Sequence, residues 1–332
     1  MPRISIIVPC FNEERTITQL LSAIYNQDYP RSHLEVIIAD GLSTDSTRQQ
    51  ITSFHQSHSD LALQVIDNPK RLIPAGLNAA IAAAKGTTIV RLDAHCVPRP
   101  DYLSRSQKAL DSGLGWNVGG VWEIKPSGQG WVAASIAIAA SHPLGVGDAF
   151  YRFTRQPKEV DTVPFGAFRK DLVNKIGGFD ETLHTNEDYE FNARIRHAKG
   201  KIWLDPDIKA TYFARPTLSA LARQYARYGF WKYKMLRRYP HTLRFRQALP
   251  PLFVLSLALL ALGGLIWPWL HRVLWVEVVS YFLLLLGAAV LKTLEVKQIK
   301  LLLGIPLAIA TMHLSWGTAF LWSLFSPGVR KV

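Results

Sequence analysis

Three long apolar segments near the end of the chain constrain its fold more than any other feature. They are residues 249–270, 273–291 and 300–325. Each is close to the roughly 20 residues that a helix needs to cross a bilayer. Glu277 interrupts the second segment, and Pro306 and His313 interrupt the third. A buried helical hairpin in a soluble protein is the alternative, but three such segments in succession are typical of membrane helices.

Positive charge is concentrated immediately before the first apolar segment. The cluster comprises Lys232, Lys234, Arg237, Arg238, Arg244 and Arg246, in a chain whose formal net charge is +13. Nucleic-acid-binding proteins also carry such charge. A cluster beside membrane helices, however, is typical of charge that faces the cytoplasmic side of a membrane. We therefore expect a membrane partner and no nucleic acid.

The same charges predict the orientation of the spans. Lys292, Lys297 and Lys300 lie between the second and third apolar segments, which places that loop inside together with the basic cluster. Three spans then put the N-terminus inside and the C-terminus outside. The trailing Arg330 and Lys331 oppose this orientation.

Strand and helix patterns alternate four times in the first 100 residues. The strand patterns cover residues 4–8, 35–39, 63–66 and 89–92, and helical patterns follow the first three. This alternation predicts an α/β fold with a doubly wound, mostly parallel sheet. Right-handed crossovers then place Pro9–Glu13, Asp40–Asp45 and Asp93–His95 at one edge of the sheet, where ligands bind in such folds.

The predicted organisation is a catalytic α/β domain followed by membrane helices. The domain covers residues 1–235, a basic juxtamembrane segment covers 236–248, and three transmembrane helices occupy 249–326. Further strands are predicted at 161–168 and 202–205. The chain has only two cysteines, which fits a reducing compartment and gives no disulfide framework.

Asp93-Ala94-His95 is the most informative local sequence. A carboxylate and an imidazole just past a buried strand can hold a divalent metal, and a metal at this edge usually faces a phosphate. The alternative is a simple turn in which Asp93 accepts hydrogen bonds from nearby backbone amides.

Five short motifs occur together in a specific order. They are Val8-Pro9-Cys10-Phe11-Asn12-Glu13, Asp40-Gly41-Leu42-Ser43-Thr44-Asp45, Asp93-Ala94-His95, Gly177-Gly178-Phe179-Asp180 and Glu187-Asp188. Each is weak alone, but the series over residues 4–230 resembles a family 2 glycosyltransferase of the GT-A fold. It is most similar to membrane-attached members of bacterial exopolysaccharide clusters, such as succinoglycan-type glucosyltransferases.

The resemblance implies a nucleotide pocket along the predicted sheet edge. Pro9, Asn12 and Glu13 would line it, although Asn12 or Glu13 also suits a helix cap. Asp40 resembles the acid that accepts a hydrogen bond from a uracil ring, and an ionised carboxylate is a strong acceptor for that group. An Asx turn is the alternative for Asp40. Asp93 would serve the nucleotide as well.

The resemblance also implies a divalent cation, Mn²⁺ or Mg²⁺, held against the donor diphosphate. Asp93 and His95 stand where the family usually carries Asp-x-Asp. Here His95 replaces the second carboxylate, and imidazole suits Mn²⁺ better than Mg²⁺. The leaving group is a nucleoside diphosphate whose developing charge needs neutralising.

Two further motifs carry catalytic and acceptor roles in the family. Asp188 of the Glu187-Asp188 pair matches the general base, and Glu187 is assigned beside it to the acceptor or diphosphate. Gln224 and Arg227 resemble a Gln-x-x-Arg-Trp motif that holds the diphosphate and acceptor, with Tyr228 in place of Trp. The alternatives are ordinary first-turn acids and an interfacial helix.

The resulting hypothesis is an inverting glycosyltransferase at the inner membrane, with its catalytic domain in the cytoplasm. It would move a hexose from a UDP-sugar to a lipid-linked saccharide in extracellular polysaccharide synthesis, beside other polysaccharide-assembly proteins. One alternative is a polyprenyl-phosphate sugar synthase, whose phosphate acceptor needs no base. Another is a membrane-anchored nucleotide-binding scaffold without activity.

Overall fold

The computed structural model describes residues 3–326, apart from the side chain of His241. The chain forms two compact units. The first comprises residues 1–123 and 153–212, and the second comprises 124–152 and 213–332. This division differs from the boundary predicted at residue 235. The apolar helix within 124–152 and the helix after residue 213 pack with the C-terminal helices in one hydrophobic cluster, so they belong with the second unit.

A nine-stranded sheet is built mainly from the first unit. Its strands are β1 Ile4–Cys10, β2 Leu34–Asp40, β3 Ala62–Asp67, β4 Thr88–Arg91, β5 Val97–Pro98, β6 Asn117–Pro126, β7 Lys158–Glu159, β8 Ala167–Arg169 and β9 Ile202–Ala214. The order is β3-β2-β1-β4-β8-β6-β9-β5, with β7 paired to β9.

The first four strands are parallel, as the alternating pattern predicts. β1 pairs in parallel with β2 and β4, and β2 pairs in parallel with β3. Beyond β4 the sheet contains antiparallel pairs: β8 pairs with β4 and β6, while β5 and β7 pair with β9. The α/β fold is therefore confirmed with a mixed sheet, and the parallel half carries the predicted ligand edge.

Some predicted boundaries differ from the structure. The strand predicted over 161–168 is reduced to β8, and the strand predicted at 202–205 continues through all of β9. The first helix begins at Ile17 rather than near Asn12, because Asn12 adopts a left-handed φ of 55° that no helix contains. Residues 11–16 are thereby free to form a loop at the ligand edge.

Helices cover the sheet of the first unit. They are α1 Ile17–Tyr25, α2 Thr47–Ser57, α3 Ile73–Ala83, α4 Tyr102–Asp111, α7 Leu172–Ile176 and α8 Glu187–His197. The helical pattern that follows the first predicted strand consists of Ile17, Leu20, Leu21 and Ile24, and all four are fully buried in α1. Burying each of these side chains contributes about 1.5–3 kcal/mol, which holds α1 against the sheet.

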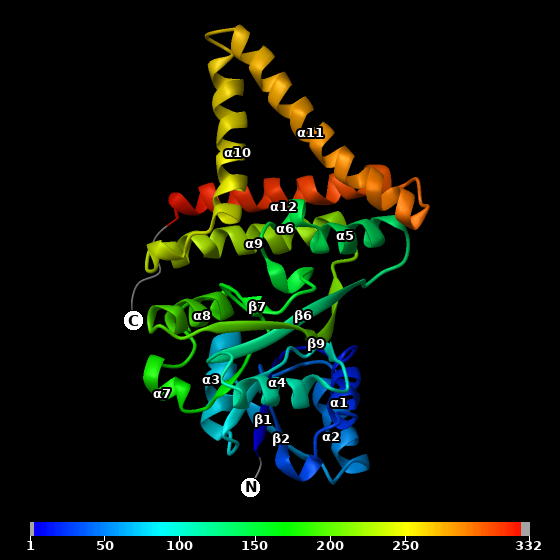
Figure 1. Ribbon diagram of the computed structural model, residues 1–332, viewed down its shortest axis with the longest axis vertical. Coiled ribbons are helices and arrows are strands. Elements are labelled where there is room, and N and C mark those ends of the chain that lie inside the picture. The colour runs from blue at the N-terminus through cyan, green and yellow to red at the C-terminus, as the bar shows by residue number, and fades with distance from the viewer. Residues whose placement is uncertain (1–2, 327–332) are drawn as a thin grey trace. The chain divides into compact units, whose positions relative to one another are not determined.

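The second unit consists of helices. They are α5 Trp131–Ser141, α6 Pro143–Val146, α9 Leu218–Leu236, α10 Phe245–Gly263, α11 Trp269–Val296 and α12 Leu301–Leu324. By length and composition α10, α11 and α12 are each able to cross a membrane, in agreement with the three predicted segments. Figure 1 shows α10 and α11 as a projecting hairpin, and α12 beside α9.

Candidate active site

The loops after β1 and β2 are held together by reciprocal hydrogen bonds. Gly41 N donates to Cys10 O at 2.7 Å, directly after the last pair of the ladder. Asn12 N donates to Ser43 Oγ at 2.9 Å, and Thr44 N donates to Asn12 Oδ1 at 2.8 Å. The two loops therefore form one connected edge, as the predicted crossovers require.

Glu13 and His95 join the third predicted loop to this edge. His95 Nδ1 lies 3.1 Å from Glu13 Oε1, and their side chains are 37% and 25% exposed. Thr16 Oγ1 donates to the other carboxylate oxygen of Glu13 at 2.6 Å, and Glu13 N donates to Thr47 Oγ1 at 2.8 Å. Glu13 is thus oriented from several sides and in turn orients the imidazole.

Asp40 is fully buried and already bonded. Its Oδ2 accepts from Ser43 N at 3.0 Å and from Arg48 Nε at 2.5 Å, and its Oδ1 accepts from Ser43 Oγ at 2.5 Å. These bonds hold Asp40 in the turn that leads to Ser43. Its role toward a nucleotide base stays a prediction, because the base would have to share or replace one of these three donors.

Arg91 connects the metal and base candidates of the sequence. It is the last residue of β4, and its side chain is 4% exposed. Its Nη2 donates to Asp93 Oδ1 at 3.1 Å and to Glu187 Oε1 at 2.9 Å, while its Nη1 donates to Asp188 Oδ1. Among residues 3–326 its buried Nε has no hydrogen-bond partner. We call Arg91, Asp93, Glu187 and Asp188 the arginine cluster.

The arginine cluster combines one positive charge with three carboxylates. Burial by itself lowers the pKa of Arg91, but the negative charges of Asp188, Asp93 and Glu187 raise this pKa by more than burial lowers it. The guanidinium therefore stays charged. Burial raises the pKa of Asp188 well above its usual value. Arg91 opposes this rise, while the charges of Glu187 and Asp93 add to it. A carboxyl with a raised pKa beside a buried cation is typical of a functional site.

Asp188 is the more accessible acid of the predicted pair. α8 begins at Glu187, as predicted, directly after Asn186 in the left-handed region at φ 69°. The Glu187 side chain is 8% exposed, whereas that of Asp188 is 22% exposed. Of the two, Asp188 therefore has the better access to an acceptor hydroxyl.

Sequence reasoning overlooked Arg91 because it sits within an apolar strand pattern. The signal was present, since an arginine in a buried strand requires carboxylate or hydrogen-bonding partners. The predicted strand also ran to Leu92, whereas β4 ends at Arg91 and Asp93 follows two residues later. This earlier end leaves both side chains at the sheet edge.

The remaining predicted site residues lie in β1 and in α9. Pro9 belongs to β1, where it pairs with Ala39. Gln224 and Arg227 lie on α9 in the second unit, where Gln224 Nε2 donates to Tyr228 Oη at 2.9 Å. Arg227 is exposed. Their roles toward diphosphate and acceptor stay predictions.

The metal candidates offer a partial ligand set. Within residues 3–326 no group of three or more His, Cys, Asp or Glu side chains is arranged to hold a metal. Asp93 and His95 are both partly exposed, and His95 is oriented by a carboxylate, as ligating histidines commonly are. This donor set fits a cation that takes one or two protein ligands and completes its shell with substrate phosphates.

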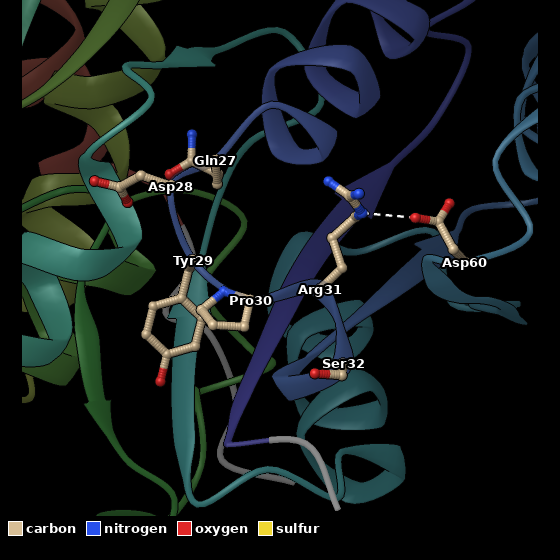
Figure 2. A pocket seen from close by; sticks show the side chains of 7 residues that line it. All are labelled: Gln27, Asp28, Tyr29, Pro30, Arg31, Ser32 and Asp60. Atoms are coloured by element: carbon tan, nitrogen blue, oxygen red, sulfur yellow. Dashed lines mark hydrogen bonds and ion pairs between the residues drawn. The ribbon is translucent and has the colours of Figure 1, made fainter.

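A cavity elsewhere in the first unit has no catalytic constellation. It has a volume of about 610 Å³ and is lined by Gln27, Asp28, Tyr29, Pro30, Arg31, Ser32 and Asp60 (Figure 2). These residues precede β2 and β3, so they lie at the opposite edge of the sheet from the candidate site. Its charged pair, Arg31 and Asp60, is 2.6 Å apart and about half exposed, which is typical of a surface ion pair.

Known proteins are similar to this chain in both sequence and fold. Residues 5–177 match the profile of glycosyl transferase family 2. Dolichyl N-acetyl-alpha-D-glucosaminyl phosphate 3-beta-D-2,3-diacetamido-2,3-dideoxy-beta-D-glucuronosyltransferase of Methanococcus voltae is 30% identical over 71% of this chain and 74% of its own. Succinoglycan biosynthesis protein ExoA of Rhizobium meliloti is 29% identical over 95% of this chain and 93% of its own.

A solved structure agrees at the level of the fold. The mannosyltransferase PcManGT of Pyrobaculum calidifontis, in complex with GDP-Man and Mn²⁺, is 22% identical, with a TM-score of 0.62 over 98% of this chain and 87% of its own. The predicted GT-A fold is thereby confirmed. Since the family profile covers more than half of the residues, this chain belongs to glycosyl transferase family 2 and is a glycosyltransferase.

Proposed function

We propose that this chain transfers a sugar from a nucleotide-diphosphate donor to a lipid-linked saccharide, with inversion, at the cytoplasmic face of the inner membrane. The observation that carries the proposal is the arginine cluster at the parallel sheet edge. It places the base candidate Asp188 and the metal candidate Asp93 on one buried cation, Arg91. A donor side and an acceptor side of one reaction centre are thereby joined.

Similar proteins support a nucleotide-sugar donor. PcManGT is described in complex with GDP-Man, and Staphylococcus aureus TarS in complex with UDP-GlcNAc. A UDP-linked hexose is our choice for this chain, because Asp40 stands at the sequence position of the uracil-binding acid in the family.

The acceptor proposal rests on the relatives and on the apolar helices. The Methanococcus voltae relative is named for an acceptor in which a sugar is already linked to dolichyl phosphate. ExoA is named for succinoglycan biosynthesis and matches this chain over nearly its whole length. Three helices that are apolar and long enough to enter a bilayer would hold the enzyme where lipid-linked acceptors are found. We therefore place the reaction within extracellular polysaccharide assembly.

In the proposed reaction Asp188 accepts the proton of the acceptor hydroxyl as its oxygen attacks the anomeric carbon of the donor sugar. The bond from that carbon to the diphosphate breaks in the same displacement, so the configuration is inverted. Arg91 keeps part of the Asp188 population ionised, because a nearby positive charge favours the carboxylate over the acid. Asp93 and His95 would hold a divalent cation that neutralises the leaving diphosphate when bound.

His95 is the point at which this chain departs from the family pattern. We expect His95→Asp to retain activity and to shift the metal preference toward Mg²⁺, because a carboxylate is the harder ligand. We expect His95→Ala to raise the Mn²⁺ concentration for half-maximal activity by about tenfold or more. Metal titrations of both variants measure this, with His33→Ala at the opposite sheet edge as the control. An unchanged titration for His95→Ala would exclude His95 as a ligand.

A substitution at Asp40 tests whether this residue binds the base of the nucleotide. If Asp40 accepts a hydrogen bond from the base, Asp40→Asn weakens UDP binding by about 1.5–3 kcal/mol, the usual contribution of a hydrogen bond to a charged group. Isothermal titration with UDP measures the change. Asp67→Asn is the matched control, because Asp67 is the other carboxylate partner of Arg48 and is exposed. Equal UDP affinity in both variants, with a lower melting temperature only for Asp40→Asn, would restrict Asp40 to a structural role.

The experiment that tests the function as a whole is a donor panel with lipid extract as acceptor. The purified membrane protein is supplied with Mn²⁺ and each common nucleotide sugar, and both UDP or GDP release and the lipid product are measured. Transfer to a lipid-linked saccharide supports the proposal. Transfer to polyprenyl phosphate alone would favour a polyprenyl-phosphate sugar synthase, and binding without turnover would favour a scaffold.

A further inference from the structure

The three apolar helices of the second unit differ in how much of their surface is buried. In the most apolar stretch of α10 and of α11, 17% and 11% of residues are buried, against 44% in α12. Four of the exposed large side chains of α12 follow one helical stripe, and two more are exposed at its end. The stripe consists of Leu303, Leu307, Leu314 and Trp322, and the end carries Leu324 and Phe325. α12 therefore packs against protein on one face and leaves apolar side chains exposed, so what it packs against decides where it lies.

The packed face of α12 runs along α9. Gly229 of α9 meets the backbone of Trp316 so closely that a Cβ atom there would lie 2.2 Å from the Trp316 carbonyl oxygen. One turn further along both helices, the rings of Tyr233 and Phe320 contact each other with centroids 5.4 Å apart. The two helices therefore run in the same direction in a fixed register, side by side in Figure 1.

This register decides whether α12 is able to cross a bilayer. The middle of α12, near Met312, is level with Tyr225 of α9, because these residues lie one turn before Trp316 and Gly229 in the same register. Arg223 and Arg227 flank Tyr225 and are both exposed. If α12 crossed the membrane, α9 would be carried with it and these two guanidinium groups would reach the centre of the hydrocarbon. Arginine there is strongly unfavourable.

The hairpin of α10 and α11 extends beyond α12. α12 contacts the first turns of α10. There Trp316 Nε1 donates to Gln247 O at 3.4 Å, and Gly317 packs on Pro250. The far end of the hairpin has no such cover and exposes Leu259, Leu262, Leu265, Ile266, Trp267 and Trp269. Tryptophan at the end of an apolar hairpin is typical of the second membrane–water interface. Glu277, which lies within the apolar part of the hairpin, accepts a hydrogen bond from Ser256 of α10 at 2.5 Å.

We infer that only α10 and α11 cross the membrane, and that α12, packed on α9, lies in the cytoplasmic interface with its apolar stripe in the bilayer surface. The partner of this stripe is a lipid surface rather than another protein. Two features that precede α12 in the chain support this choice. α11 enters the bilayer directly before α12, and the loop between the two helices is basic.

Two spans change the predicted orientation of the C-terminus. Three spans put Arg330 and Lys331 outside, against the positive-inside rule, whereas two spans put them inside with the other basic residues. Arg330 and Lys331 lie outside the residues that the structure describes, so this agreement comes from the sequence alone. The inference goes beyond the proposed function and does not depend on it.

Cysteine labelling in intact cells distinguishes the two topologies. A cysteine is added after Val332 of the 332-residue chain, and labelling with a membrane-impermeant maleimide is compared before and after permeabilisation. Two spans predict labelling only after permeabilisation. Trp267→Cys, between α10 and α11, labels in intact cells under either topology, and Gln298→Cys, between α11 and α12, does not. These two variants are the controls. Labelling of the added cysteine in intact cells would overturn the inference.

Spin labels measure the depth of α12 without reference to its ends. Nitroxides are attached at Leu303, Leu314 and Trp322 of the protein in lipid vesicles, and their accessibilities to oxygen and to a polar nickel chelate are compared. A surface helix gives similar, shallow depths at all three positions. A spanning helix gives a clear maximum of depth at Leu314, and that result would overturn the inference even where the protein is inactive.

Discussion

Replacing Asp188 with Asn is expected to lower kcat by about 10²–10⁴-fold, the usual contribution of a general base. Asparagine has nearly the same shape and its amide oxygen can still accept from Arg91, so donor affinity and folding should be retained. Single-turnover rates with saturating donor and acceptor measure the effect. Asp60→Asn is the matched control, because it removes a carboxylate from an exposed ion pair at the other sheet edge.

The pH dependence sharpens this prediction. Burial and two neighbouring carboxylates raise the pKa of Asp188, so activity should fall on the acid side at a pH above the usual carboxyl range of about 4. Asp188→Asn should lack this acid limb. The sign for stability is the reverse of that for a salt-bridged acid. The folded protein holds this proton more tightly than the unfolded chain, so the contribution of Asp188 to stability decreases as the pH rises through its folded pKa.

Asp188→Asn should therefore be at least as stable as the unsubstituted protein at neutral pH. Thermal melting at several pH values measures this. Near-normal rates in Asp188→Asn would exclude the base assignment and favour a phosphate acceptor, which needs no base. A large loss of melting temperature would show instead that Asp188 serves the fold.

The second large effect is expected for Arg91→Met. Methionine fills most of the volume but leaves three carboxylates around a buried site without a counter-charge. Removing one partner of a buried ion pair typically costs about 3–5 kcal/mol. The first unit should therefore melt at a clearly lower temperature. Thermal melting followed by tryptophan fluorescence measures it, with Arg105→Met as control, since Arg105 pairs with two exposed carboxylates and should cost about 1 kcal/mol or less.

A double substitution separates charge from packing. If the carboxylates are what Arg91 stabilises, Arg91→Met with Asp188→Asn should be less destabilised than the sum of the two single changes predicts, because one uncompensated charge is gone. Arg91→Met should also move the acid limb of activity to higher pH, as the opposing positive charge is lost. Strict additivity together with an unchanged pH profile would show that Arg91 only fills space.

Much of the fold was predictable because its signals are local. β-branched runs separated by amphipathic helices predict a parallel sheet, and β1 to β4 follow that pattern. Helical spacing predicted the buried face of α1 residue by residue. The antiparallel half was not predictable in the same way, because β5, β7 and β8 are two or three residues long and their partners lie far away in the chain. Such short strands depend on tertiary pairing rather than on pattern.

For the candidate site, the sequence predicted several of the residues but not the contacts between them. The order of the motifs placed Asp93, His95 and Asp188 in one family of enzymes, and right-handed crossovers placed the first three loops at one edge. Neither argument showed that Glu13 contacts His95 or that Arg91 contacts Glu187 and Asp188, since these contacts join residues 82 or more positions apart.

The sequence by itself determined the chemical inventory: a parallel sheet edge with carboxylates and an imidazole, and three helices apolar enough for a membrane. Hydrophobic periodicity and motif order suffice for this, because both are properties of short segments. The tertiary structure decided how the charges are shared. It pairs Arg91 with three carboxylates, and it packs α12 along the charged helix α9. Charge pairing and helix packing depend on which distant segments meet. The hydropathy of a single segment does not indicate which other segment it packs against.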